Sequence, residues 1–362
     1  MAGISYQQQL AEKKEYIRKL FEDLATPELE VFESPSKYYR MRAEFRVWHE
    51  GEVCFYAMFE PGKKAGGASL IRCDQFDTAH SSINDMMPRL MAAVTDNPVL
   101  KNRWYAVEFL ATLSGEMLLT MIYHKKLDEE WQAAARALQE ELGIWIIGRS
   151  RGQKVILTQD FVTERLQVGE RVFVYRQLEG GFTQPNAEVC QKMLAWACDC
   201  AEGLGGDMLE LYCGNGNFTL PLATRFKHVL ATEVSKTSVN AALWNIQAND
   251  CDNVQIVRLS AEEFTEAYTG NRAFRRLQEQ GIALADYEFS TIFVDPPRAG
   301  VDDETLKLVA QFENVIYISC NPETLHDNLV KLNATHTIER MALFDQFPFT
   351  HHIESGVLLK KR

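Results

Sequence analysis

The second half of the chain alternates strand-like and helix-like segments in strict order, and this alternation restricts the fold more than any other feature. From about residue 186 to residue 362, five short apolar segments are each followed by a helical segment, and two strand-like segments come last. Strands that alternate with helices form a parallel sheet, because each crossover returns the chain to the same sheet edge. We therefore predict an α/β domain with a seven-stranded, Rossmann-like sheet that ends in a hairpin.

The first half of the chain has a different pattern. Residues 4–23 form the pattern of an amphipathic helix, and residues from about 37 to 180 are mostly strand-like, with helices near 79–95 and 128–142. This mixture is typical of an α+β domain rather than of a parallel sheet.

A glycine-containing segment, "LEGGFTQPN" (178–186), separates the two halves. A chain of 362 residues is long enough for two domains with their own cores. We predict an N-terminal α+β domain over 1–180 and a C-terminal α/β domain over 181–362. We expect the helix within residues 1–30 to pack on the C-terminal domain.

The composition is that of an ordinary globular protein, with 46% hydrophobic and 24% charged residues. No apolar run approaches the roughly 18 residues that cross a bilayer, and the charged N-terminal segment has no signal-peptide core. We therefore expect a cytoplasmic protein that does not bind a membrane. The net charge of −12 argues against a general polyanion binder but allows a local basic groove.

The eight cysteines are scattered and contain no C-x-x-C pair. Such pairs are the usual framework of structural zinc and iron–sulfur sites. We therefore expect no metal and no iron–sulfur cluster, and interpret most of these thiols as small buried hydrophobes.

The segment "LELYCGNGNFTL" (209–220) has the pattern of a strand, a tight glycine turn and a helix start. Backbone N–H groups around Gly214 and Gly216 can approach a ligand closely, and Glu233, at the end of the next strand, can accept both hydroxyls of a ribose. A generic nucleotide-fold turn is the alternative. The turn lacks the third glycine of a dinucleotide fingerprint, so with the terminal hairpin it favours S-adenosylmethionine over NAD.

The fourth strand ends in "FVDPPRAG" (293–300), which puts Asp295 at the carboxyl edge of the sheet. Ligands of open α/β sheets bind at this edge. The two prolines fix the backbone and leave its carbonyls free, which suits recognition of a nucleobase edge. The alternative is a rigid loop in which Asp295 caps the following helix.

The fifth strand ends in "YISCNPETL" (317–325), so Cys320 lies at the same edge. Asn321 is a good helix cap and Pro322 a good first helical residue. A thiol before a helix N-terminus has a lowered pKa, which favours a nucleophilic thiolate. A buried strand-end cysteine is the alternative.

Glu354 begins the last strand, in "HIESGVLL". If that strand is antiparallel and beside the fifth, it begins where its parallel neighbours end, so Glu354 is expected near Cys320 and Asp295. The alternative is a surface glutamate on an edge strand. We interpret His351 and His352 as supporting residues.

A thiolate, a carboxylate and a methyl donor together indicate one reaction. C5 of uracil is a poor nucleophile, but a thiolate that adds to C6 makes an enolate, and C5 can then attack a methyl group. A base must remove the C5 proton before the thiolate leaves. Cys320 and Glu354 fit these two roles.

The strand "KYYRMRAEFRVWHEG" (37–51) alternates strictly between two faces. One face presents Arg40, Arg42, Arg46 and Trp48, which suits contacts with RNA phosphates and bases. A solvated outer face is the alternative. For Tyr105 and for Trp104 two interpretations remain: each ring either stacks on an RNA base or belongs to the core.

These stretches resemble the RNA 5-methyluridine methyltransferase family, and within it the bacterial tRNA (uracil-54-C5)-methyltransferases. The matching pieces occur in order along nearly the whole chain: "YRMRAEFRVWHEG", "GGFTQPN", "LELYCGNGNF", "TIFVDPPR", "YISCNPETL" and "LFDQFPFTHHIE". The rRNA-directed relatives usually carry an N-terminal barrel and iron–sulfur cysteines, which this chain lacks. The resemblance therefore favours the tRNA-directed branch.

The resemblance implies that the C-terminal domain is an S-adenosylmethionine-dependent methyltransferase and the N-terminal domain binds RNA. It implies methyl transfer to C5 of uridine 54 in the tRNA T-loop, through a covalent bond from Cys320 to C6 and proton abstraction by Glu354. The expected cofactor-binding residues are Gln184, Tyr212, Gly214, Asn217, Glu233 and Asp295. The expected RNA-binding residues are Arg40, Arg42, Arg46, Tyr105, Phe182 and Arg298.

The expected partner is tRNA, with other RNAs that carry a T-loop-like hairpin as further candidates, and no obligate protein partner is expected. Two alternatives remain open. One is an N-methyltransferase acting on a nucleobase amine, because "DPP" resembles the proline-containing motif of those enzymes. The other is an RNA-binding or tRNA-folding protein with a vestigial cofactor pocket.

Overall fold

The computed structural model describes residues 4–362, and these divide into two compact units. Unit 1 comprises the described residues up to Ser36, Leu166–Tyr175 and Glu188–Arg362, and unit 2 comprises Lys37–Arg165 and Arg176–Ala187. This division differs from the single boundary expected between residues 180 and 181. The reason lies in contacts that the sequence pattern does not show: an N-terminal strand joins the sheet of unit 1, and Arg171 and Val174 bond to Asn249.

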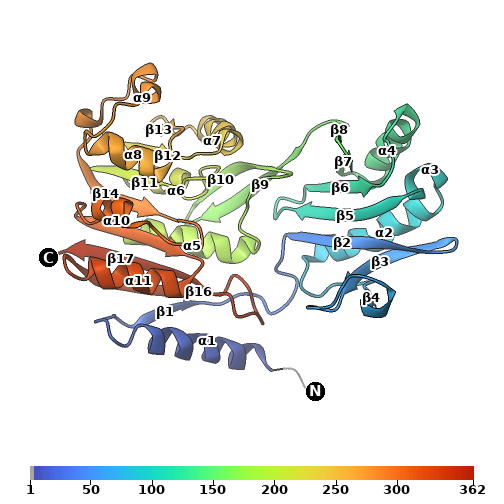
Figure 1. Cartoon of the computed structure of the whole chain (residues 1–362), viewed down its shortest axis with the longest axis horizontal. Coiled ribbons are helices and arrows are strands. Elements are labelled where there is room, and N and C mark those ends of the chain that lie inside the picture. Colours follow the sequence, from blue (N-terminus) through green and yellow to red (C-terminus); the bar gives the residue numbers. More distant parts are fainter. Residues whose placement is uncertain (1–3) are drawn as a thin grey trace. The chain divides into compact units, whose positions relative to one another are not determined.

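The sheet of unit 1 has eight strands in the order β1-β16-β17-β15-β14-β11-β12-β13 (Figure 1). Only β17 is antiparallel to its neighbours, and it lies between β15 and β16. The strands are β1 (Leu29–Phe32), β11 (Asp207–Leu211), β12 (Val229–Thr232), β13 (Val254–Val257), β14 (Phe289–Val294), β15 (Asn314–Ser319), β16 (His336–Phe344) and β17 (Glu354–Lys361).

The predicted α/β class and the terminal antiparallel strand beside the fifth parallel strand are therefore confirmed. All seven strands predicted for the C-terminal half are present, and β1, from the N-terminal segment, adds an eighth that pairs in parallel with β16. A strand of four residues is too short for its periodicity to be recognised before its partner is known.

Helices of unit 1 cover the sheet, and several of them begin at side-chain caps. Ser235 caps α7, Ser260 and Glu263 form a capping box at α8, and Asp302 caps α10. The helices are α1 (Tyr6–Leu20), α5 (Ala187–Cys200), α6 (Thr219–Ala223), α7 (Lys236–Ala248), α8 (Ala261–Tyr268), α9 (Arg275–Glu279), α10 (Asp303–Val309) and α11 (Pro322–Leu332).

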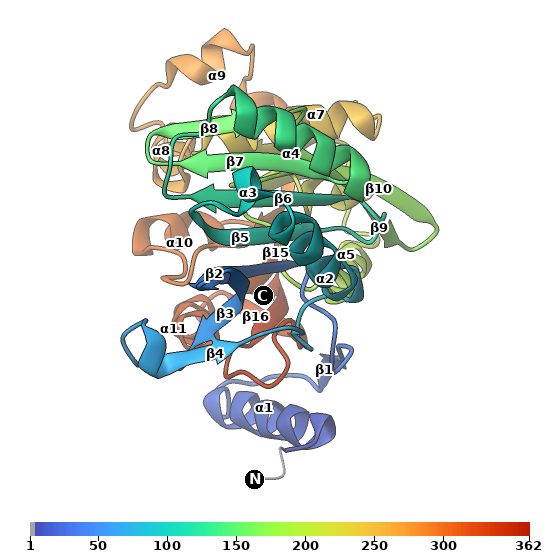
Figure 2. The ribbon, with the colours of Figure 1, turned by 90° about the vertical axis from the view of Figure 1, so that its right-hand side faces the viewer.

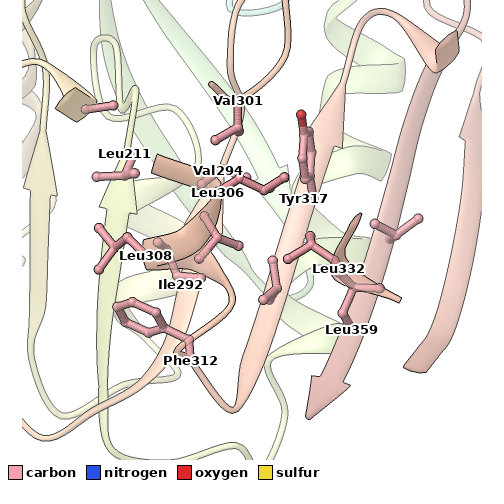
Figure 3. Close-up of a cluster of buried hydrophobic side chains, with 14 of the residues drawn as sticks. Leu211, Ile292, Val294, Val301, Leu306, Leu308, Phe312, Tyr317, Leu332 and Leu359 are labelled. Atoms are coloured by element: carbon pink, nitrogen blue, oxygen red, sulfur yellow. The ribbon is translucent and has the colours of Figure 1, made fainter. Parts of the chain in front are cut away.

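The core of unit 1 forms where these helices meet the parallel strands. Figure 3 shows Ile292 and Val294 of β14 beside Leu306 and Leu308 of α10, and all four side chains are buried. Burial of each such side chain contributes about 1.5–3 kcal/mol. This packing holds the strand ends, and therefore the residues that follow them, in fixed positions.

Unit 2 contains a seven-stranded sheet in the order β4-β3-β2-β5-β6-β7-β8. Its strands are β2 (Arg42–Glu50), β3 (Val53–Phe59), β4 (Leu70–Arg72), β5 (Trp104–Ala111), β6 (Met117–Tyr123), β7 (Trp145–Ser150) and β8 (Gln153–Ile156). Helices α2 (Ser81–Thr95), α3 (Pro98–Lys101) and α4 (Glu129–Leu142) lie together on one face of it (Figure 2). The helices predicted near 79–95 and 128–142 are confirmed by α2 and α4.

Strand β2 confirms the predicted alternation, because Ala43, Phe45 and Val47 are buried and the residues between them are not. A two-stranded sheet of β9 (Phe161–Val168) and β10 (Arg171–Leu178) contributes residues to both units. None of the helices within residues 4–362 has the length and apolar character needed to cross a membrane.

Candidate active site

The carboxyl ends of the parallel strands in unit 1 gather the polar residues that the sequence singled out. Gly214 follows β11, Glu233 follows β12, Asp295 follows β14 and Cys320 follows β15. Strand β17 runs in the opposite direction and begins at Glu354. Ser319 pairs with Ser355, so Cys320 and Glu354 both lie one step beyond the same cross-strand pair. The expected proximity of these two residues is confirmed.

Cys320 lines a cavity of about 570 Å³ in unit 1. The cavity is also lined by Arg298, by residues of α1 and by Phe349–Ile353. Cys320 is partly exposed, whereas the other seven cysteines are buried. A buried thiol is inert, and a thiol that opens into a cavity is accessible to a substrate.

The thiol of Cys320 is more basic than expected. Burial, with smaller contributions from the charges of Glu354 and Asp295, raises its pKa to about 11. The predicted lowering of this pKa by the following helix is therefore wrong. Asn321 caps α11 by accepting from the N–H of Glu323, as predicted, but desolvation and two nearby carboxyls outweigh the helix N-terminus at the sulfur.

The two carboxyls near Cys320 are also perturbed. Glu354 is 5% exposed, and burial, with a contribution from Asp295, raises its pKa well above the usual range. Burial raises the pKa of Asp295 to about 7. Helix α10 is capped by Asp302 and not by Asp295, so the alternative that Asp295 is a helix cap is wrong. Near neutral pH this cluster holds protons that ordinary carboxyls have lost.

The glycine turn after β11 is tied to the end of β12. The N–H of Gly214 donates to Oε2 of Glu233 at 3.0 Å, and the N–H of Ser235 donates to Oε1 at 2.8 Å. The N–H of Gly216 donates to the carbonyl of Cys213. These two glycine N–H groups therefore have partners within the protein in the absence of a ligand. The turn is nevertheless open, because a Cβ at Gly214 would meet nothing within 4 Å.

The other expected cofactor-binding residues lie in different surroundings. Tyr212 has a left-handed backbone (φ +60°) and is partly buried. The side chain of Asn217 contacts the sulfur of Cys190 at 3.5 Å. Gln184 belongs to unit 2, and its amide oxygen is buried without a hydrogen-bond partner among the described residues. A buried acceptor without a partner is uncommon, and a ligand donor would satisfy it.

Sequence reasoning missed Glu210, which lies within β11 and is 1% exposed. Burial, with smaller contributions from the charges of Asp295 and Glu233, raises its pKa to about 8. Its signal in the sequence is a single acidic residue inside the apolar segment "MLELYC". The carboxyl edge of this sheet therefore holds four acidic side chains, at Glu210, Glu233, Asp295 and Glu354. No group of His, Cys, Asp and Glu within residues 4–362 is arranged to hold a metal ion.

Unit 2 has a surface on which a cation and two rings stack. The guanidinium of Arg46 lies 3.5 Å from the ring centroid of Tyr105, and this ring stacks on His124 with 3.8 Å between centroids. Tyr105 is partly exposed, whereas Trp104 is buried and belongs to the core. Sequence reasoning missed His124, because the register that places β6 beside β5 brings it to Tyr105.

The remaining expected RNA-binding residues differ in accessibility. Arg42 donates to the carbonyls of Glu179 and Gly181 at 2.9 and 3.0 Å, so its guanidinium already has partners within unit 2. Arg40 donates from Nε to the carbonyl of Arg42. Phe182 is 78% exposed in unit 2, and Arg298 is exposed in unit 1 beside the cavity.

Comparisons with known proteins agree over almost the whole chain. The model of the family described as tRNA (Uracil-5-)-methyltransferase matches residues 5–362. A tRNA/tmRNA (uracil-C(5))-methyltransferase of Neisseria meningitidis serogroup A is 70% identical over 357 residues, which cover 99% of each chain. One from Acinetobacter baylyi is 61% identical over 356 residues, which cover 98% of this chain and 99% of that one.

A solved structure is similar in fold at low sequence identity. It is the tRNA (uracil-54, C5)-methyltransferase of Pyrococcus abyssi in complex with S-adenosyl-L-homocysteine. The TM-score is 0.73 at 19% identity, and the match covers 98% of this chain and 84% of that one. This likeness supports the fold described above.

Proposed function

The chain belongs to the tRNA (uracil-5-)-methyltransferase family, and from this premise we propose that it transfers a methyl group from S-adenosylmethionine to C5 of uridine 54 in the tRNA T-loop. The observation that carries the mechanism is the pairing of Ser319 with Ser355, which puts Cys320 and Glu354 each one residue from the same cross-strand pair, with Cys320 at the cavity. The names of the relatives also include tmRNA, so a T-loop-like hairpin of tmRNA is a second proposed substrate.

In the proposed reaction, the sulfur of Cys320 adds to C6 of the uracil and makes C5 nucleophilic. S-adenosylmethionine, when bound, supplies the methyl group that C5 takes up while C6 is bonded to sulfur. Glu354 then accepts the proton from C5, the bond from sulfur to C6 breaks, and the double bond between C5 and C6 is restored. Cys320 leaves as a thiolate, and Glu354 releases the proton to solvent, which returns both groups to the protonation states in which the reaction began.

The raised pKa values suit these two roles. A thiolate of higher pKa is intrinsically more nucleophilic once it is formed. A carboxylate of raised pKa binds a proton more tightly, so Glu354 is a stronger base than an exposed glutamate. The thiolate of Cys320 and the carboxylate of Glu354 repel each other, so both can be ionised together only if bound substrate and cofactor reduce this repulsion.

The cofactor residues are proposed from chemistry and from two observations of fit. Glu233 would accept the ribose hydroxyls, and Gly214 leaves open space beside it. The unpartnered amide oxygen of Gln184 would accept a donor. Tyr212, Asn217 and Asp295 complete the proposed set.

We propose that unit 2 binds the RNA through the stack of Arg46, Tyr105 and His124. Aromatic rings and guanidinium planes stack on unpaired bases, and a target base in a folded loop must leave its stack to be methylated. Phe182 is a further proposed base contact because most of its ring is exposed. We also propose contacts with the RNA backbone for Arg40, Arg42 and Arg298. Arg42 would act indirectly, by holding the segment that contains Glu179 and Gly181.

The experiment that tests the mechanism uses tRNA containing 5-fluorouridine. Fluorine at C5 cannot leave as a proton, so a covalent protein–RNA complex should persist on a denaturing gel. We expect this band with the unmodified protein and with Cys251→Ala, which removes a buried thiol outside the cavity, and no band with Cys320→Ala.

Two other results would replace the proposal. Methyl transfer to ordinary tRNA by Cys320→Ala would mean that the chemistry bypasses the thiol, as in an N-methyltransferase acting on a nucleobase amine. Binding of tRNA by the unmodified protein with neither a covalent band nor methyl transfer would favour the RNA-binding or tRNA-folding alternative.

A further inference from the structure

The cavity beside Cys320 is larger than a single uracil ring requires. Pockets that hold drug-sized ligands measure roughly 300–1,000 Å³, and this cavity of about 570 Å³ lies within that range. Two of its walls contain no residue with a proposed role in methyl transfer. One is the N-terminal helix α1, and the other is the loop 345–353, which joins β16 to β17.

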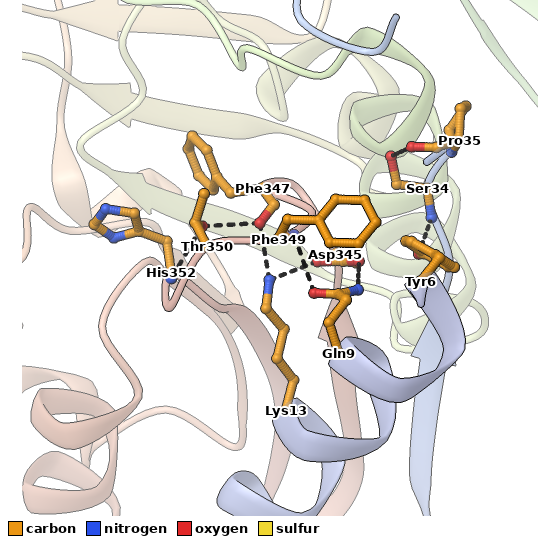
Figure 4. A network of polar contacts seen from close by, with 10 residues as sticks. All are labelled: Tyr6, Gln9, Lys13, Ser34, Pro35, Asp345, Phe347, Phe349, Thr350 and His352. Atoms are coloured by element: carbon orange, nitrogen blue, oxygen red, sulfur yellow. Dashed lines mark hydrogen bonds and ion pairs between the residues drawn. The ribbon is translucent and has the colours of Figure 1, made fainter. Parts of the chain in front are cut away.

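Helix α1 is joined to the loop 345–353 by buried polar contacts (Figure 4). Nζ of Lys13 lies 2.7 Å from Oδ1 of Asp345 and donates to the carbonyl of Phe347 at 2.9 Å. Nε2 of Gln9 donates to Oδ2 of Asp345 at 2.8 Å. The side chains of Lys13 and Asp345 are 7% and 0% exposed. Buried charges that are paired in this way hold their elements in one register.

The same helix also contacts α11, which begins directly after Cys320. Tyr16 donates to Glu323 at 3.2 Å, and Asp23, just beyond the helix, bonds to His326 at 2.8 Å. The contacts of α1 therefore join the segment that follows Cys320 to the segment that precedes Glu354.

Phe349, in the middle of this loop, has an unusual conformation. Its backbone is left-handed, with φ +59°, and its N–H donates to Oε1 of Gln9 at 3.2 Å. Such a conformation is strained for a residue with a side chain and persists only where surrounding contacts hold it. The ring meets Tyr6 edge-on at 6.1 Å, lines the cavity and remains 50% exposed. A large apolar ring held at a cavity wall is suited to a flat, apolar ligand face.

Hydrogen-bond donors lie along the same cavity. Arg298, His351 and His352 line it, and the two imidazole rings are 4.3 Å apart. The contacts of the loop continue to His352, because Thr350 donates to the carbonyl of Phe347 and accepts from the N–H of His352. Glu12 and Glu323 are the acidic residues at the cavity. The lining therefore combines an aromatic ring with donors for phosphate or base oxygens.

We propose that Phe349 is a base-stacking residue for the RNA nucleotide adjacent to the target uridine, and that α1 holds it in place through Gln9 and Lys13. The proposal rests on the proposed function, because it takes the target base to be at Cys320. A nucleotide next to a flipped base loses a stacking partner, and an aromatic ring beside the nucleophile replaces it. Phe349 and α1 are then part of the RNA-binding surface of unit 1.

The test is a double-mutant cycle between the protein and the RNA. Binding is measured for a T-loop hairpin and for two hairpins in which the nucleotide before or after the target is abasic. We expect Phe349→Ala to weaken binding of the intact hairpin about tenfold, within the range known for base–aromatic stacking. We expect no further loss with one of the abasic hairpins, because the stacked base is already absent there.

Three further variants keep the test interpretable. Phe349→Gly removes the ring and adopts a left-handed backbone without strain, so it should match Phe349→Ala. Phe349→Tyr keeps an aromatic ring and should bind normally. Leu243→Ala removes an equally exposed apolar side chain outside the cavity and should change nothing.

Equal losses with the intact hairpin and both abasic hairpins would overturn the proposal, and so would the absence of any loss with Phe349→Ala and Phe349→Gly. The covalent complex with 5-fluorouridine RNA, measured in parallel, reports on the proposed function separately. If the unmodified protein formed no such complex, the proposed function would fail while the binding cycle would still show whether Phe349 contacts a base.

Discussion

The strand ends of unit 1 and the strand faces of unit 2 use polar residues in opposite ways. In unit 1, Glu210, Asp295 and Glu354 are enclosed, and burial raises the pKa of each. In unit 2, Arg46, Tyr105 and His124 stack on one another at an accessible surface. Proton transfer needs surroundings that change proton affinity, whereas base stacking needs a flat surface that a ligand can reach. Substitutions in the two regions should therefore affect different kinetic constants.

The ion pairs of the two units show the same contrast. Lys13 and Asp345 in unit 1 are 7% and 0% exposed, whereas Arg149 and Glu179 in unit 2 are 41% and 5% exposed. A pair that solvent reaches loses much of its net contribution to screening and hydration. The buried pair of unit 1 depends on both partners, because either charge alone would be left without compensation.

The largest effect is expected at the chemical step in unit 1. Glu354→Gln should lower kcat by about 10²–10⁴-fold, the usual contribution of a general base. Because the C5 proton then stays in place, a covalent, methylated RNA–protein complex should accumulate with ordinary tRNA, and a denaturing gel with labelled methyl donor would detect it. Glu164→Gln, at a buried acid of unit 2 whose pKa burial raises to about 7, is the matched control and should form no such complex. Normal turnover by Glu354→Gln would remove Glu354 from the mechanism.

The next effect concerns the stability of the buried pair. Lys13→Met leaves Asp345 charged and buried, so the free energy of unfolding should fall by about 3–5 kcal/mol. Arg149→Met in unit 2 should cost only about 1 kcal/mol, because its guanidinium is 41% exposed and Lys154 remains paired with Glu179 at 3.2 Å. Urea denaturation measures both values. Adding Asp345→Asn to Lys13→Met should restore part of the loss, and equal costs for the two pairs would contradict the contrast.

A smaller effect, on binding alone, is expected in unit 2. Tyr105→Ala should weaken tRNA binding by about tenfold, with little change in kcat, because it removes a stacking surface and no reacting group. Steady-state kinetics separate the two constants. Val53→Ala, at an exposed apolar side chain of the same unit, should be neutral. A fall in kcat without a change in KM would show that Tyr105 acts on the chemical step.

The smallest effect is a dependence of stability on pH. Asp295 and Glu210 have pKa values of about 7 and about 8 in the folded protein, above the value of about 4 for unfolded chains. Between pH of about 4 and about 8, the folded state therefore binds more protons than the unfolded state. The stabilisation is fully present at low pH and is lost as the pH rises through this range. The Tm of the free protein should decrease from pH 5 to pH 8.

Asp295→Asn should flatten this decrease, because the neutral amide does not titrate. Asp250→Asn, at an exposed side chain of the same unit, should leave the slope unchanged. A Tm that rises over the same pH range would show that paired carboxylates elsewhere dominate the titration.

Much of the fold and part of the site followed from local pattern. The order of strands and helices, the antiparallel last strand and the cap of α11 at Asn321 were predicted correctly, and so was the proximity of Cys320 and Glu354. The reason is that periodicity, caps and crossovers depend on residues a few positions apart. The eighth strand and the division into units were not predictable in this way, because β1 is defined only by its partner β16.

The sequence by itself determined which chemical groups this protein brings to one edge of its parallel sheet, because each group directly follows a strand of recognisable pattern. Only the tertiary structure decided the protonation of Cys320, the partners of Arg42 and the contact of α1 with the loop 345–353. Lys13 and Asp345 are 332 positions apart in the chain. Desolvation and charge interactions sum over neighbours in space, so their sign at a given atom is fixed only when distant segments have packed around it.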